Sequence, residues 1–260
     1  MTWLKNKLIE ANQKYLFVNW LFGLVDGVLL INGNRKCNSV KKYHNKYKGK
    51  RCFIIGNGPS LNKTDLSKLS GEYCFGSNRI YLIRYFKPTF LVSVNDLVLS
   101  QCAEEIAGQK CVKFISSRAS KIFDRLKDSG ETFFLNQFYQ AKFSSNPELG
   151  VWPGGTVTFV CLQLAYYMGF DEVILVGVDH KFKTTGNNNE KILTIGDDPN
   201  HFSKDYFRGF KWNLPDLDTS EFAYNLAKKA YEDTGRLIVD ATIGGNLRIF
   251  KKCNYKDLFL

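Results

Sequence analysis

The sequence has few of the residue patterns that mark metal sites and redox motifs. Its seven cysteines are scattered along 260 residues, and no two of them form a C-x-x-C pair. This excludes a zinc ribbon and a thioredoxin-type redox motif. Cys52, Cys74 and Cys161 lie inside apolar runs, where cysteine behaves as a small buried hydrophobe. No cleavable secretory signal is evident, so the expected compartment is the reducing cytoplasm.

Acidic side chains are missing from Gly27 to Thr64, which makes the beginning of the chain strongly basic. Residues 1–51 hold eleven lysines and arginines against two acidic residues, so they carry most of the formal net charge of +11. We therefore divide the chain into a basic and apolar N-terminal segment, residues 1–50, and an α/β body, residues 51–260. A basic run also suits nucleic acid, but no recognised nucleic-acid motif accompanies it, and no nucleic-acid partner is expected.

Residues 15–31 form the most apolar stretch of the sequence and have basic residues on both sides. Seventeen residues is short for a bilayer span, and Asn19 and Asp26 weaken that interpretation. Apolar insertion combined with attraction to anionic lipid predicts an anchor at the membrane surface, which would hold the protein peripherally at the inner membrane face. The alternative is a helix or hairpin that packs on its own domain or on a partner subunit, and an oligomer stays open.

From Arg51 onward, short apolar runs alternate with helical patterns. Five apolar runs bounded by turn residues predict buried strands, at Cys52–Ile55, Tyr73–Phe75, Phe90–Val94, Cys111–Ile115 and Val173–Val176. Leu237–Val239 is a weaker strand candidate and Thr132–Leu135 a candidate edge strand, while the predicted helices are Leu97–Ala107, Thr156–Gly169 and Asp218–Asp233. This alternation predicts an α/β fold with a Rossmann-like parallel sheet and helices on both of its faces.

Polar residues follow the predicted strands, at the edge of a parallel sheet where ligands bind. These strand-end residues are Gly56, Asn57, Gly58 and Ser60 after the first strand, Asn78 after the second, Asn95 after the third, and Asp179 with His180 after the Val173–Val176 strand. Asparagine side chains offer both a donor and an acceptor, which suits ribose hydroxyls and the edge of a base. The two glycines of the first loop would let backbone amides approach a phosphate, and a helix start after them would favour its negative charge.

The first loop matches neither of the two best-known phosphate motifs. The third glycine of the Rossmann fingerprint is replaced by Leu61, and no acid sits at the distance expected for a dinucleotide ribose. A Walker A motif occurs nowhere in the chain. The loop is therefore predicted to bind a single nucleoside phosphate, and the alternative is a tight strand-to-helix turn with an asparagine cap.

Histidine is scarce, with only His44, His180 and His201 in the chain. His44 lies in the basic segment and is expected to be solvated, whereas His180 directly follows a strand end. His201 lies in a long polar insertion, residues 181–215, which is predicted to be a lid over the site. A lid histidine can act as a general base near neutral pH, and the alternative is a surface histidine on a mobile loop.

Several stretches together resemble the DUF115 family, over residues 48–260. They are Arg-Cys-Phe-Ile-Ile-Gly-Asn-Gly-Pro-Ser-Leu (51–61), Phe-Gly-Ser-Asn-Arg-Ile-Tyr-Leu (75–82), Gly-Gly-Thr-Val-Thr-Phe-Val (154–160), Met-Gly-Phe-Asp-Glu-Val-Ile-Leu-Val-Gly-Val-Asp-His (168–180), Asp-Pro-Asn-His-Phe (198–202) and Asp-Ala-Thr-Ile-Gly-Gly-Asn-Leu (240–247). The family includes archaeal 6-hydroxymethylpterin pyrophosphokinase-like proteins and domains of motility-associated flagellin glycosylation proteins. More distantly, the chain is similar to the sialyltransferases of glycosyltransferase family 42.

The resemblance implies roles for individual residues. By similarity to the sialyltransferases, Asn57, Asn78, Asn95, Gly155, Thr156 and Asp179 would hold the cytidine monophosphate of a CMP-sugar, together with the Gly-Asn-Gly-Pro-Ser loop. His201 matches the lid histidine that acts as general base, and the resemblance implies neither a metal nor another cofactor. The chain departs from the family where two tyrosines neutralise the leaving phosphate. His180 and Lys181 stand at that point, and Lys181 or Tyr206 is the candidate substitute.

The resemblance leads to one function and two alternatives. The first is a glycosyltransferase that moves a keto-sugar acid, sialic-acid-like or Kdo-like, from a CMP-activated donor to a cell-surface glycan acceptor, with inversion. The second is a pyrophosphokinase that transfers from ATP to a 6-hydroxymethylpterin. It needs Mg²⁺, for which Asp96, Asp179, Asp197 and Asp198 are the candidate ligands. The third is a non-catalytic nucleotide-sugar-binding subunit of a glycan assembly complex.

Overall fold

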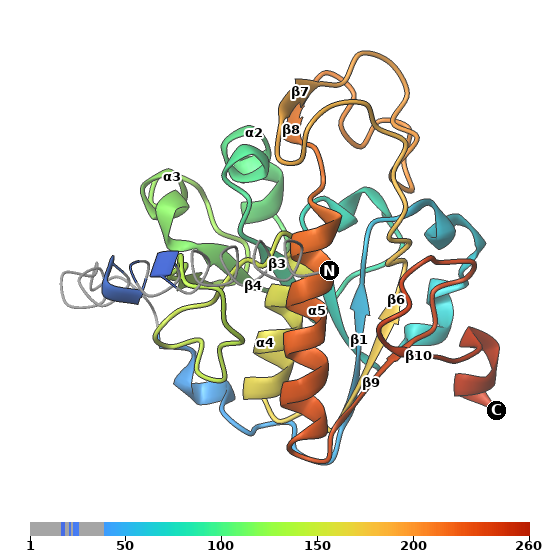
Figure 1. The fold of residues 1–260 in the computed structure, drawn as a ribbon. Helices are drawn as coiled ribbons and strands as arrows, with labels where there is room; N and C mark the ends of the chain where they lie inside the picture. The colour runs from blue at the N-terminus through green and yellow to red at the C-terminus, as the bar shows by residue number, and fades with distance from the viewer. Residues whose placement is uncertain (1–16, 19–20, 22, 26–38) are drawn as a thin grey trace, which may run out of the picture.

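The computed structural model describes residues 17–18, 21, 23–25 and 39–260, and its centre is one eight-stranded parallel sheet (Figure 1). The strand order is β10-β9-β6-β1-β2-β3-β4-β5, and every pair is parallel. Helices pack on both faces of this sheet. The predicted Rossmann-like α/β fold is therefore confirmed.

All seven predicted strands occur within a residue or two of their expected ends. The sheet consists of β1 Arg51–Ile55, β2 Tyr73–Ser77, β3 Phe90–Ser93, β4 Val112–Ser116, β5 Glu131–Leu135, β6 Glu172–Val176, β9 Leu237–Asp240 and β10 Lys251–Lys252. The helices are α2 Asp96–Ala107, α3 Ser120–Phe123, α4 Val157–Tyr167 and α5 Leu217–Glu232, and the 3₁₀ helices are η1 Val40–Tyr43, η2 Pro59–Lys63, η3 Leu66–Leu69, η4 Ile80–Leu82, η5 Ser117–Ala119 and η6 Tyr255–Phe259. The edge strand β10 was not predicted, because its two exposed lysines carry no apolar pattern.

Alternate side chains of β1 point to two separate cores. Cys52 and Ile54 join a core formed with α4, α5 and η1. Phe53 and Ile55 join the opposite core, which includes α2 and the 3₁₀ helices that follow β1. A strand buried on both faces has no polar side to show, so its sequence is a continuous apolar run. Cys52, Cys74 and Cys161 are buried as expected.

The end of the basic segment belongs to the first of these cores. Val40, Tyr43 and Tyr47 are buried, and the Tyr47 ring stacks on Phe170 with a centroid distance of 4.8 Å. His44 is exposed, as expected. The boundary at residue 50 stays a prediction, but residues 40–47 pack as part of the α/β body. Most of the apolar stretch 15–31 lies outside the described residues, and within those described no helix is long and apolar enough to cross a bilayer.

The insertion at residues 181–215 contains a two-stranded antiparallel sheet of β7 Lys191–Leu193 and β8 Lys211–Asn213. In Figure 1 this sheet stands beyond the carboxyl ends of the central strands. The Gln101 side chain of α2 holds it by donating to the Lys211 carbonyl and accepting from the Lys211 amide, at 2.8 and 2.9 Å. The two short strands were not predicted, since each has only three residues and is mostly polar.

Candidate functional site

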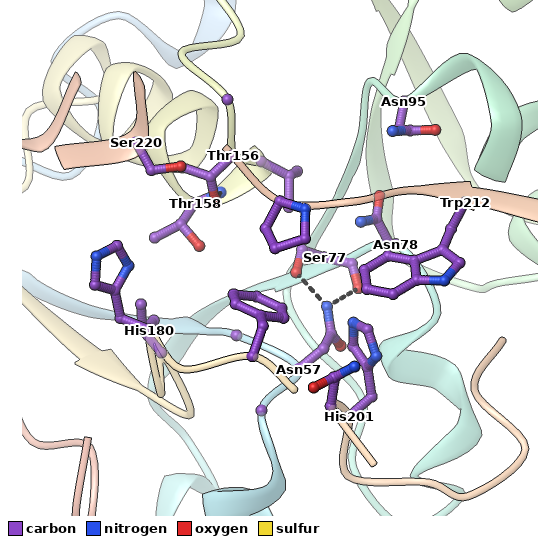
Figure 2. A pocket seen from close by; sticks show the side chains of 18 of the residues that line it. Asn57, Ser77, Asn78, Asn95, Thr156, Thr158, His180, His201, Trp212 and Ser220 are labelled. Carbon is purple, nitrogen blue, oxygen red and sulfur yellow. Dashed lines mark hydrogen bonds between the residues drawn. The ribbon is translucent and has the colours of Figure 1, made fainter. Parts of the chain in front are cut away.

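A cavity of about 460 Å³ lies between the lid and the strand ends of β1, β2, β3 and β6. Most of the residues predicted for the site line this cavity, and Figure 2 shows several of them around it. They are Gly56, Asn57, Gly58, Asn78, Asn95, Gly155, Thr156, Asp179, His180, Lys181, His201 and Tyr206. Ser60 is the exception, since it does not line the cavity but binds Asp179, which does. The structure thus brings the predicted residues together, and their roles in binding and catalysis stay predictions.

The two glycines of the first loop are explained by packing against the end of β6. A Cβ atom on Gly56 would lie 2.3 Å from the Gly177 carbonyl oxygen, and one on Gly58 would lie 1.9 Å from Asp179 Oδ2. Their amides donate to the carbonyls of Val176 and Gly177, at 2.8 and 2.9 Å. This differs from the expected phosphate cradle, because both amides are already used. The helix start after them is also only the five-residue η2.

Ser60 and Asp179 fix the same loop from behind. The Ser60 amide donates to Asp179 Oδ1 at 3.1 Å, and the Ser60 hydroxyl donates to Oδ2 at 2.6 Å. Both carboxylate oxygens therefore hold the loop between β1 and η2. Asp179 thus shapes the cavity from its wall, and its contact with a nucleotide stays a prediction.

Asn57 presents an unused acceptor to the cavity. Its side-chain amide donates to the carbonyl and the hydroxyl of Ser77, at 3.2 and 2.8 Å (Figure 2). Its Oδ1 atom is buried and has no hydrogen-bond partner among the described residues. A buried acceptor without a partner is costly, so a ligand that donates a hydrogen bond here would relieve that cost. A sugar hydroxyl or an amino group has the right chemistry.

The other two strand-end asparagines each use one side-chain oxygen within the protein. Asn78 adopts a positive φ of 49°, and its Oδ1 accepts from the Ser93 hydroxyl at 3.0 Å. Asn95 caps α2, since its Oδ1 accepts from the amides of Leu97 and Val98 at 2.9 and 3.1 Å. The cap that was considered for the first loop therefore occurs after the third strand. In both residues the amide group is left as the donor toward the cavity.

The beginning of α4 forms a second polar wall. Gly155 turns the chain with a φ of 71°, and Thr156 then caps the helix by accepting from the Thr158 amide at 3.3 Å. Thr156, Thr158 and Ser220 gather on this side of the cavity (Figure 2). The first amides of an α-helix have no partners within the helix and favour negative charge. The amides of Thr158 and Phe159 already donate to Thr156, so this wall offers an anion chiefly the positive end of the α4 dipole.

His201 is held as one member of a buried pair. Its Nδ1 lies 2.8 Å from Asp198 Oδ2, and the side chains of the two residues are only 11% and 2% exposed. The Tyr206 ring stacks flat on the imidazole, with a centroid distance of 4.1 Å and an angle of 4°. With Nδ1 bound to a carboxylate, the remaining ring nitrogen is an acceptor and can take a proton. Figure 2 shows this ring beside Asn57 and Trp212.

The candidates for contacting a leaving phosphate lie in different settings. His180 has a φ of 51°, is nearly buried, and contacts Glu221 Oε1 through Nε2 at 3.0 Å. Lys181 is exposed at the rim of the cavity. The Tyr206 hydroxyl is buried and accepts from the Arg79 amide at 3.2 Å, so it is occupied within the wall. Burial raises the pKa of the Tyr206 phenol far above its usual range, which keeps it neutral.

The carboxylates proposed for Mg²⁺ do not form a common ligand set. Asp96 pairs with Arg118 at 3.3 Å, Asp197 pairs with Lys204 at 3.3 Å, and Asp198 and Asp179 have the partners given above. Across the described part of the chain, no group of three His, Cys, Asp or Glu side chains is arranged to hold a metal ion. The described residues thus form no ready-made cluster for Mg²⁺, and of the four candidate carboxylates only Asp179 lines the cavity.

Some cavity residues were not predicted from the sequence. Ser77, Thr158, Trp212 and Ser220 line the cavity, and Asp198, which the sequence offered only as a candidate Mg²⁺ ligand, stands behind His201. A signal was present only for Asp198, which lies three residues before His201 in the same polar stretch. Trp212 comes from β8 and Ser220 from α5, so only the folded chain brings them to the strand ends.

The fold and cavity define a Rossmann-like α/β protein with its site at the carboxyl edge of the sheet. Residues 29–185 match the family model described as 6-hydroxymethylpterin diphosphokinase MptE-like, and the chain belongs to this MptE-like family. Among solved structures, it is similar to the MAf glycosyltransferase from Magnetospirillum magneticum AMB-1, with a TM-score of 0.51 and 17% identity. That match covers 82% of this chain but 37% of the other, and it shows a shared fold. No curated protein matches the sequence.

Proposed function

We propose that the protein is a glycosyltransferase that transfers a keto-sugar acid from a CMP-activated donor to a hydroxyl of a cell-surface glycan. The observation that carries the proposal is the His201–Asp198 pair, with its 2.8 Å contact, in the lid over the cavity. A buried carboxylate on one ring nitrogen fixes the tautomer and stabilises the imidazolium that forms on protonation. His201 is therefore suited to take a proton from a substrate hydroxyl near neutral pH.

The proposed reaction uses this base in a single displacement. The free ring nitrogen of His201 takes the proton of the acceptor hydroxyl, and the oxygen attacks the anomeric carbon of the donor. The bond from that carbon to the phosphate oxygen breaks, so cytidine monophosphate leaves with the electron pair and the configuration inverts. Lys181 at the rim and the first turn of α4 are the groups that would stabilise the charge on the phosphate.

The charge of the cavity favours a donor with one phosphate. Of the described side chains that line it, Lys181 is the only lysine or arginine, and the carboxylate of Asp179 is bound to Ser60. A triphosphate carries several negative charges and needs metal ions or more cations to bind. A CMP-sugar has a single phosphodiester, and the unused Asn57 Oδ1 supplies an acceptor for one of its hydroxyl or amino groups.

The pyrophosphokinase is the second candidate, because the description of the family model names that activity. The same histidine would deprotonate the hydroxymethyl group of a pterin, which would attack the β-phosphate of ATP. The separate pairing of Asp96, Asp179, Asp197 and Asp198 argues against it, as does the nearly neutral cavity.

The candidates are separated by nucleotide binding. Thermal shift and calorimetry are measured with CMP, UDP, ATP, and ATP with Mg²⁺, followed by turnover with CMP-keto-sugars. CMP binding without metal is expected, and a ligand at 100 times its Kd stabilises the fold by about 2.7 kcal/mol. Binding of ATP that depends on Mg²⁺, without any response to CMP, would contradict the proposal. CMP binding without turnover on any glycan acceptor would favour a non-catalytic subunit.

We also propose that residues 1–38 bring this activity to an anionic membrane surface. Phe17, Leu21 and Leu24 are exposed in the described part of this segment, at 62%, 46% and 51%. Exposed apolar side chains next to a run of lysines are typical of interfacial membrane binding. A cytoplasmic enzyme held there would meet lipid-linked glycans.

A further inference from the structure

Arg79 is a buried arginine that the proposed chemistry does not use. It follows Asn78 at the end of β2, is 6% exposed, and pairs with no acidic side chain in the described regions. Arginine is almost never fully buried without a partner charge, because removing its hydration is costly. Its burial against main-chain oxygens therefore calls for a specific explanation.

Most contacts of the Arg79 guanidinium are with the lid, and its Nε also donates to the Tyr81 hydroxyl of η4 at 3.4 Å. Its Nη1 donates to the carbonyls of Tyr206 and of Asp205, the latter at 3.4 Å. Its plane lies over the Phe210 ring, with 4.5 Å from Cζ to the centroid. A guanidinium over an aromatic face gains cation–π attraction, most of all where water is excluded. Asp205, Tyr206 and Phe210 all belong to residues 205–210, the part of the lid that follows His201.

The main chain of Arg79 also binds Tyr206, at its hydroxyl group. Its amide donates to the Tyr206 hydroxyl at 3.2 Å, so one arginine binds both the carbonyl and the phenol of Tyr206. The Tyr206 ring is then the surface on which His201 lies, at 4.1 Å and nearly parallel. Phe207 and Trp212 close the remaining sides of the imidazole with edge contacts at 5.0 and 5.7 Å.

We infer that Arg79 is a positioning residue that sets the place of the general base through Tyr206. Asp198 fixes which ring nitrogen is free, and Tyr206 fixes the plane of the ring. Of these two contacts of the ring, Tyr206 is the one tied to the sheet, through Arg79. The chain next to His201 is held separately by the Phe202 amide, which donates to the Asn57 carbonyl at 2.9 Å. The strand end that carries Asn78, at the cavity, is thus linked to the lid that carries His201. The inference deepens the proposed function and rests on His201 being its base.

The direct test is the NMR signal of the His201 ring protons, since the chain has only three histidines and each can be assigned by substitution. A parallel aromatic ring 4.1 Å away shifts these protons upfield. Arg79→Met keeps the length of the side chain but removes its donors and charge. We expect the His201 signal to move toward its position in Tyr206→Leu, which lacks the stacked ring, while the exposed His44 does not move.

Lys113→Met is the matched control. Lys113 is likewise fully buried and donates to main-chain carbonyls, those of Gln109 and Cys111, but it also pairs with Asp128 at 2.7 Å, lies on β4 and does not line the cavity. It should leave the His201 signal in place even if it lowers stability. An unmoved His201 signal in Arg79→Met would overturn the inference. So would an equal change of all three histidine signals in both variants, since that is general loosening.

Turnover gives the second readout. With a CMP-sugar donor, Arg79→Met should lower kcat by at least about tenfold, because small misplacements of a catalytic group are costly, while KM for the donor changes much less. Arg79→Lys, which keeps a cation and some donors, should retain more of kcat. Unchanged kcat together with a shifted His201 signal would also overturn the inference. If the wild type neither binds CMP nor turns over, the proposed function fails, and the NMR result alone decides whether Arg79 positions His201.

Discussion

At the residue scale, the candidate site depends on which side chains are free and which are already bound. Asp179 and the two loop glycines were predicted to contact the nucleotide, which stays a prediction, and in the structure their polar atoms also hold the loop against the end of β6. Asn57 keeps one buried acceptor without a partner among the described residues. Sequence patterns locate such residues at strand ends, but they do not say which atoms remain available, because the partners come from other elements, 20 positions away for Asn57 and 119 for Asp179.

Asp198→Asn tests the role of the carboxylate behind His201. An asparagine keeps the size but can hold the wrong tautomer and does not stabilise the imidazolium, so turnover should fall by about 10²- to 10⁴-fold. Calorimetry should show CMP affinity within about threefold of the wild type, since Asp198 does not line the cavity. Asp197→Asn is the matched control, because the neighbouring Asp197 forms exposed pairs with Lys204 and Arg208. Equal losses in both variants would contradict the assignment.

Gly58→Ala tests whether the loop glycine is required for packing. The φ of Gly58 is −71°, which alanine adopts easily, so any cost comes from the methyl group that would lie 1.9 Å from Asp179 Oδ2. Displacing Asp179 breaks its two bonds to Ser60, and we expect a loss of about 2 kcal/mol in the free energy of unfolding. Urea denaturation measures it. Gly108→Ala should be nearly neutral, because a Cβ atom there meets nothing closer than 3.4 Å, and similar losses in both would refute the packing explanation.

At the scale of elements, apolar runs were sufficient to predict the central sheet. β1, β3 and β6 are buried on both faces, and their sequences have no polar residue to interrupt the run. β10 and the lid strands β7 and β8 were missed because they are short and polar, and tertiary contacts alone hold them. The predicted helix Thr156–Gly169 begins at the residue that caps α4, since a threonine after two glycines is a local signal for a helix start.

The pairing of β4 with β5 should be sensitive to acid. Lys113 is fully buried on β4, and its ammonium lies 2.7 Å from Asp128 Oδ1, just before β5. Burial opposes ionisation of Asp128, but hydrogen bonds from Lys113, Thr132 and the Gly130 amide prevail, and its pKa is lowered. A carboxyl with a lower pKa in the folded state stabilises the fold above its unfolded pKa of about 3.9, and this stabilisation is lost as the pH falls through the folded pKa.

Asp128→Asn tests this at two pH values. At pH 7 it leaves Lys113 buried without a counter-charge, so the free energy of unfolding should fall by about 3 kcal/mol. As the pH falls below the unfolded pKa of about 3.9 and through the lower folded pKa, the wild type itself loses this stabilisation, and the difference between the two proteins should shrink. Urea denaturation at both pH values measures it. Asp124→Asn, a nearby exposed aspartate, serves as control, and a difference for Asp128→Asn that stays constant with pH would contradict the account.

At the scale of the whole molecule, the structure separates two parts of the basic segment. Val40, Tyr43 and Tyr47 are buried in the core beside β3, β4 and β5, whereas the exposed Phe17, Leu21 and Leu24 precede them in the chain. From the sequence, residues 1–50 were predicted to be one segment because lysines and arginines occur throughout it. The charge of a segment does not indicate which of its side chains are buried. Tyr43 and Tyr47, which lie among the lysines, were the only sign in the sequence that residues 40–47 pack on the α/β body.

Two truncations test membrane binding without confusing it with folding. Removing residues 1–38 spares the three buried side chains and keeps the lysines at 41, 42, 46, 48 and 50, so the body should keep its thermal stability. Removing residues 1–50 takes those side chains away, each worth about 1.5–3 kcal/mol, and should destabilise the fold. The first truncation is therefore the informative one for lipid.

Cosedimentation with vesicles measures the outcome. The full chain should bind vesicles that contain anionic lipid, more weakly at high salt, and should bind neutral vesicles little. The chain without residues 1–38 should lose most of this binding although five lysines remain, because charge without apolar insertion gives weak attachment. If both forms sediment alike, the lysines are sufficient and the apolar stretch has another use. If neither binds, the membrane proposal fails, while the CMP-binding test of the α/β body is unaffected.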